Sequence, residues 1–101
     1  MKLLIVTSVV AFQKDVLKLF KKADIEAFSS SEIDGYKNKH SLLATQTWFP
    51  HQEGGNESVM FFSFTEEEKV NEFFTQVKNF NQNMETNNPV RAILVPIEKF
   101  I

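Results

Sequence analysis

Residues 59–64 read VMFFSF, and this short stretch decides the fold. Successive side chains of a β-strand point to opposite faces, so a strand with one solvated face alternates apolar and polar residues. Here one face carries Met60, Phe62 and Phe64, and the other carries Val59 and Phe61. Both faces of this strand are therefore predicted to be covered.

Residues 2–10 form a second predicted strand, and the run Leu-Leu-Ile-Val at residues 3–6 is likewise apolar on both faces. The chain has 101 residues, which is the size of one domain and too few for helices on both sides of a sheet. We therefore expect one domain spanning residues 1–101, with other copies covering the second face. This pattern predicts an obligate oligomer.

Composition narrows the function classes. Eleven phenylalanines and a hydrophobic content of 43% are far from a disordered composition. Cysteine is absent, which excludes disulfides and thiol catalysis. A net charge of −2 argues against a nucleic-acid partner, since phosphate-backbone binding needs clustered positive charge. No signal-peptide cleavage site follows the apolar N-terminal run, so we expect a cytoplasmic protein.

Helical spacing marks two further elements. Residues 13–23 are predicted to form a helix, and another begins after Thr65, which we expect to cap it in a capping box with Glu68. The second helix carries an apolar stripe at i, i+3, i+4, i+7 and i+10, made of Val70, Phe73, Phe74, Val77 and Phe80. This stripe is predicted to pack on the sheet.

The remaining strands are predicted at residues 25–36 and 90–95. The order is therefore βαββαβ, an α+β fold of the ferredoxin-like type. Between the second and third strands, residues 37–56 form a long excursion with strand-like content and a turn cluster. Long connections of this kind are often functional.

Few residues carry recognisable chemistry. No nucleophile signature is present, so we expect no enzyme activity. His40, His51 and Glu53 are candidate metal ligands, but their spacing matches no metal motif. The aromatic third strand resembles RNA-recognition modules, yet residues 56–59 lack the basic residue and glycine that those modules place before their aromatics.

Lys37, Lys39 and Arg91 are candidate anion contacts. The two lysines follow the second predicted strand, and Arg91 opens the last one. Arginine suits bidentate recognition of phosphate or carboxylate. The alternative is that all three are ordinary solvated charges.

Two segments and their order resemble the PII-like signalling superfamily. Residues 25–36 are similar to the family's second strand, which ends in a glycine and an aromatic, here Gly35 and Tyr36, before the long T-loop. Residues 93–98 resemble the closing strand, which ends with proline, an aliphatic residue and glutamate. The resemblance implies a homotrimer that binds a small ligand between subunits. It also implies that residues 37–56 are the T-loop.

The resemblance places Ser29 where a nucleotide-contacting threonine stands and Arg91 where the family lysine stands. The candidate ligand-binding residues are therefore Ser29, Gly35, Tyr36, Lys37, Lys39 and Arg91. The glycines of the family's nucleotide-binding B-loop are missing from residues 84–91. The ligand and any cofactor stay open. Short PII-like proteins are linked to membrane transporters, which implies a transporter as partner.

Two alternatives share this fold class. One is a metal-tolerance trimer of the CutA type, linked to heavy-metal efflux, that uses His40 or His51. The other is a dimeric ferredoxin-like enzyme of the antibiotic-monooxygenase or stress-barrel type. The measured mass separates trimer from dimer, and Cu(II) or Zn(II) binding that is lost on replacing both histidines with alanine would favour the metal protein.

Overall fold

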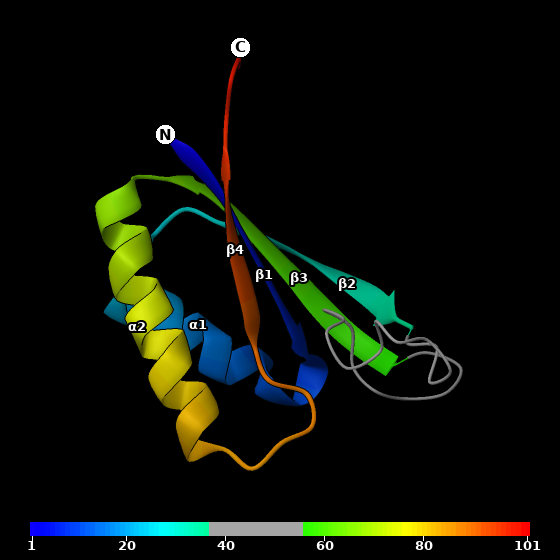
Figure 1. Ribbon diagram of the computed structural model, residues 1–101. Helices are drawn as coiled ribbons and strands as arrows, with labels where there is room; N and C mark the ends of the chain where they lie inside the picture. The colour runs from blue at the N-terminus through cyan, green and yellow to red at the C-terminus, as the bar shows by residue number, and fades with distance from the viewer. Residues whose placement is uncertain (37–55) are drawn as a thin grey trace, which may run out of the picture.

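The computed structural model describes residues 1–36 and 56–101, which form a four-stranded antiparallel sheet with two helices on one face (Figure 1). The strands are β1 (Lys2–Val9), β2 (Ser29–Gly35), β3 (Asn56–Thr65) and β4 (Arg91–Pro96). The helices are η1 (Val10–Phe12), α1 (Gln13–Lys22) and α2 (Glu67–Asn83). The strand order is β2-β3-β1-β4. The predicted α+β, ferredoxin-like architecture is confirmed.

The register of the sheet divides its side chains between two faces. β1 pairs with β3 so that Val6 lies opposite Phe61, and it pairs with β4 so that Ile5 lies opposite Ile93. Directly opposed residues share a face. The helix-covered face therefore contains Leu4, Val6, Val59, Phe61, Ala92 and Leu94.

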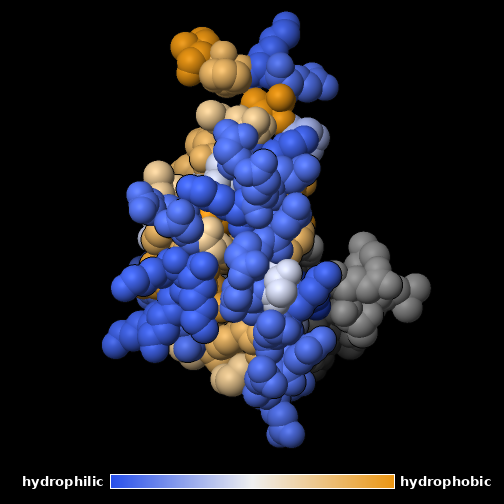
Figure 2. All heavy atoms as spheres, turned by 90° about the vertical axis from the view of Figure 1, so that its left-hand side faces the viewer, coloured by the Kyte–Doolittle hydropathy of each residue, from blue (hydrophilic) through white to orange (hydrophobic). Residues whose placement is uncertain are grey.

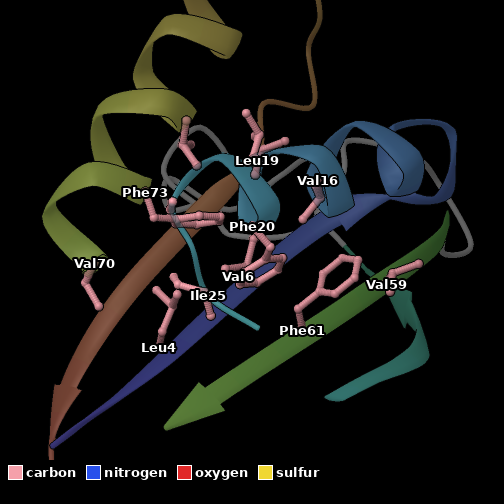
Figure 3. Packing of buried hydrophobic residues seen from close by; sticks show 13 residues of the cluster. Leu4, Val6, Val16, Leu19, Phe20, Ile25, Val59, Phe61, Val70 and Phe73 are labelled. Atoms are coloured by element: carbon pink, nitrogen blue, oxygen red, sulfur yellow. The ribbon is translucent and has the colours of Figure 1, made fainter. Parts of the chain in front are cut away.

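The core lies between this face and the two helices (Figure 3). Phe20 of α1 is fully buried at its centre and stacks on Phe28 at 4.4 Å and on Phe73 of α2 at 4.7 Å between ring centroids. The predicted stripe of α2 is confirmed. Its residues Val70, Phe73 and Val77 are buried, and Phe74 and Phe80 pack against them half-buried.

The predicted start of the second strand, at residue 25, is wrong. Residues 25–28 lie outside β2, which begins at Ser29. α1 ends in a Schellman motif, in which the Ile25 N–H donates to the Phe20 carbonyl at 3.0 Å and Asp24 takes a left-handed φ of 59°. Phe28 then packs on the core. The prediction missed this because the left-handed residue is aspartate and not glycine.

The predicted capping box at Thr65 is wrong. β3 continues through Thr65, which pairs with Lys2 of β1, so the cap position of α2 falls on Glu66. No side-chain cap hydrogen bond forms there. The Glu66 carbonyl accepts a hydrogen bond from the Val70 N–H at 3.3 Å and so begins the helix.

Among residues 1–36 and 56–101, no helix covers the other face of the sheet (Figure 1). We call it the open face, and its apolar residues are Leu3, Ile5, Val9, Ile33, Met60, Phe62, Phe64, Ile93 and Val95. Phe64 is 56% exposed and Ile93 is 38% exposed. The outer surface on the helix side is mostly hydrophilic, as Figure 2 shows. The two apolar faces expected for β1 and β3 are thus present, and only one is covered by described residues.

Candidate functional site

The residues at the two ends of β2 form the first part of the candidate site. Ser29 opens the strand, is exposed, and lies opposite Phe62 on the open face. Gly35 closes the strand opposite Asn56 and is buried. Tyr36 follows with 62% of its side chain exposed. Ser29 and Gly35 thus mark the two ends of the edge strand β2, and Tyr36 comes directly after it.

Arg91 forms the second part, at the first residue of β4. It lies opposite Thr7 of β1, on the open face, and is half-buried. Among the described residues, no carboxylate is paired with its guanidinium. The Thr7 hydroxyl beside it in the register is buried and has no hydrogen-bond partner in the described part of the chain. A half-buried guanidinium without a carboxylate partner is suited to bind an anion.

Asn81 of α2 fixes the approach to Arg91. Its side-chain amide donates from Nδ2 to the Val90 carbonyl at 2.9 Å, and its Oδ1 accepts from the Val90 N–H at 2.9 Å. Within the preceding loop, the Asn88 N–H donates to Thr86 Oγ1 at 2.9 Å. Val90 is buried, so this two-point contact also satisfies its backbone groups. Sequence reasoning missed Asn81, because a lone asparagine late in a helix carries no signal of such a contact.

The two parts do not meet within one chain. β2 and β4 are the opposite edges of the sheet, with β3 and β1 between them. Neighbouring strands are about 4.8 Å apart, so Arg91 lies roughly 14 Å across the sheet from β2. A single small ligand cannot contact both groups in the same copy.

The C-terminal half of β2 is acidic on the helix-covered face of the sheet. Glu32, Asp34 and Glu57 line a recess of about 400 Å³ beside Val10 and Ser58. Asp34 lies directly opposite Glu57 in the register, which places like charges side by side. These carboxylates repel an anion, so an anionic group is expected at Arg91 and not in this recess.

Several predicted residues lie outside the described part of the chain. Lys37 and Lys39 do, as do His40, His51 and Glu53, on which the metal-tolerance alternative depends. Residues 1–36 and 56–101 contain no group of three metal-ligating side chains. No helix within these residues is long and apolar enough to cross a membrane.

Two solved structures share this architecture. A DUF3240 family protein from Shewanella baltica OS155 superposes with a TM-score of 0.66 and 17% identity, over 98% of this chain and 91% of that one. CPII, a nitrogen regulatory PII-like protein from Thiomonas intermedia K12, superposes with a TM-score of 0.63 and 14% identity. That match covers 99% of this chain and 94% of CPII, whose structure holds ADP, AMP and bicarbonate.

The chain has a divergent PII-like fold. No protein-family model matches the sequence, and no curated protein matches it. The likeness is therefore one of architecture at low identity, which agrees with the missing B-loop glycines.

Proposed function

We propose that this protein is a trimeric PII-like regulator that binds a small anionic ligand in the clefts between its subunits. The carrying observation is the separation of the candidate site residues onto opposite edges of one sheet. If the β4 edge of one subunit faces the β2 edge of the next, Arg91 joins Ser29, Gly35 and Tyr36 in a shared cleft. Lys37 and Lys39 follow Tyr36 directly in sequence and would add positive charge there.

The uncovered open face supports the same assembly. Its nine apolar side chains would each stabilise the assembly when buried against a neighbouring subunit. A ring of three copies covers this face on every subunit. The proposed role is regulatory, by resemblance to PII-like signalling proteins.

The bound ligands of CPII supply the first compounds to test. ADP, AMP and bicarbonate are all anions, and Arg91 is the described residue best placed for such a group. Residues 37–56, which the resemblance places at the T-loop, would then connect ligand binding to a partner. By resemblance, we propose that this partner is a membrane transporter and that the protein acts at its cytoplasmic side.

Ligand-dependent stability tests the proposal. A ligand at 100 times its Kd raises the free energy of unfolding by about 2.7 kcal/mol when it binds only the folded protein. We expect at least one of ADP, AMP and bicarbonate to raise the melting temperature of the wild type. Arg91→Ala should lose this shift, and Lys78→Ala, on the exposed side of α2, should retain it.

Two outcomes of this experiment would contradict the proposed ligand site. A wild type whose melting temperature does not respond to any of the three compounds would remove the nucleotide and bicarbonate version of the proposal. A shift that survives in Arg91→Ala would place the ligand elsewhere on the protein.

A further inference from the structure

Where β2 begins, the described residues leave one edge of β3 unpaired. The pairing of β2 with β3 starts at Ser29 and Phe62, whereas β3 continues to Thr65. Phe64 and Thr65 pair with β1 on one side, and no β2 residue is opposite them on the other. The cause is the packing of Phe28 on the core, which takes residues 25–28 out of the sheet. An unpaired strand edge is able to accept a further strand.

A groove of about 300 Å³ lies along this edge, lined by residues 25–27, residues 63–66 and Lys69. The wall at Ala27 is fixed, because its carbonyl accepts a hydrogen bond of 2.6 Å from the Ser63 hydroxyl. Glu26 and Glu66 are exposed on the rim. Lys69 Nζ is 3.9 Å from Asp24 Oδ2, and this carboxylate balances the charge of the lysine. Glu66 Oε2 is in turn 3.9 Å from the Met1 amino group. The groove therefore suits an extended, partly apolar segment with little net charge.

The segment after β4 has these properties. Residues 97–101 read IEKFI and follow Pro96 away from the sheet (Figure 1). Phe100 is 75% exposed, Ile101 is fully exposed, and Lys99 stands beside them in the sequence. Pro96 and Thr65 both pair with Lys2, so this tail and the groove lie at the same end of the molecule.

We propose that residues 97–101 of one copy add as a strand to the free edge of β3 in a neighbouring copy, with Phe100 entering the groove. Backbone hydrogen bonds at the edge supply affinity, and alternate side chains supply specificity. Lys99 brings its charge to the rim that carries Glu26 and Glu66. This inference rests on the proposed trimer and specifies which segment links its subunits.

The groove of the same copy lies on the far side of β1 and β3 from the end of β4. Crossing these strands takes about 10–14 Å at 4.8 Å per strand. A neighbour whose β2 edge faces β4 receives residues 97–101 without this crossing, in a head-to-tail contact that closes as a ring.

Engineered disulfides test the contact in a chain that contains no cysteine. Glu66→Cys at the groove is combined in turn with cysteine at position 98, 99 or 100 of the tail. A disulfide requires Cα atoms within about 7 Å, so three tail positions allow for the alternation of a strand. We expect at least one pair to form covalent dimers and trimers under oxidation, which reductant reverses.

Lys78→Cys with the same tail positions is the control, because Lys78 is exposed on α2 and does not line the groove. It should give no such products. Absence of cross-links in all three groove pairs would overturn the inference, and so would a disulfide closed within one chain.

Light scattering separates this inference from the proposed function. A wild type at 11.7 kDa would overturn both, whereas three chains give about 35 kDa. The concentration of half-assembly is the protein concentration at which half of the chains are in trimers. If the wild type is a trimer, the double variant Phe100→Ser/Ile101→Ser should raise this concentration at least tenfold. A trimer whose assembly is unchanged in that variant would contradict the tail contact alone.

Discussion

Ile93→Asp should separate the subunits while leaving each chain folded. Ile93 lies on the open face opposite Ile5 and is 38% exposed in the single chain. Full burial of isoleucine contributes about 1.5–3 kcal/mol, so the exposed part is worth about 0.6–1.1 kcal/mol per subunit on assembly. A carboxylate in an apolar contact adds at least about 2 kcal/mol. The loss is then about 3 kcal/mol per subunit and about 9 kcal/mol per trimer.

The concentration of half-assembly varies with the square root of the trimer association constant. Half of about 9 kcal/mol is about 4.5 kcal/mol, which raises this concentration about a thousandfold at 1.4 kcal/mol per tenfold change. Light scattering over a dilution series measures the shift, and circular dichroism shows whether the fold persists.

Leu17→Asp is a matched control, because Leu17 is 40% exposed but lies on α1, away from the open face. It should lower the stability of the chain by about 1.4–2.3 kcal/mol, through helix propensity and the lost burial of the leucine, and leave assembly unchanged. Equal effects of the two variants on assembly would show that the open face is not the interface.

Substitutions at three further positions test the fold around the site. Asp24→Gly should stabilise the protein by about 0.5 kcal/mol in thermal unfolding, because glycine adopts the left-handed φ of 59° without steric cost, whereas Asp24→Val should destabilise it by about 1–2 kcal/mol. Asn81→Leu should cost about 2–3 kcal/mol in denaturant unfolding, because the buried N–H and C=O of Val90 lose their partner; no loss of stability would contradict that contact. Phe20→Ala should cost about 3–5 kcal/mol by leaving a cavity beside Phe28 and Phe73, and a cost below about 1 kcal/mol would contradict the stacked core.

The periodic elements of this fold could be predicted from sequence, because burial on a sheet leaves a clear pattern. The stripe of α2 and the two-faced run of β3 are confirmed. The start of β2 was missed, since residues 25–28 are apolar enough for a strand and only tertiary packing takes Phe28 into the core. The cap of α2 was misplaced because β1 pairing holds Thr65 in the sheet.

The candidate site was less predictable than the fold. The family resemblance gave Ser29, and Arg91 was a candidate anion contact at the start of the last strand. Their separation depends on strand order, which places the second and fourth strands at opposite edges. Asn81 was missed because its role consists of two hydrogen bonds to the backbone of Val90, nine residues away. Any asparagine at the end of a helix has the same local sequence appearance.

Residues 1–36 and 56–101 leave an apolar face, a strand edge and a guanidinium without partners, and together these favour the proposed ring over a stacked dimer. Two sheets stacked through their open faces would cover the apolar residues but lie about 10 Å apart, too far for backbone hydrogen bonds between strand edges. The free edge of β3 would stay unpaired, and Arg91 would have no β2 edge beside it in the same layer. Subunits placed side by side around an axis turn their open faces inward and bring unlike edges together. One arrangement thus meets the apolar, hydrogen-bonding and electrostatic requirements at once.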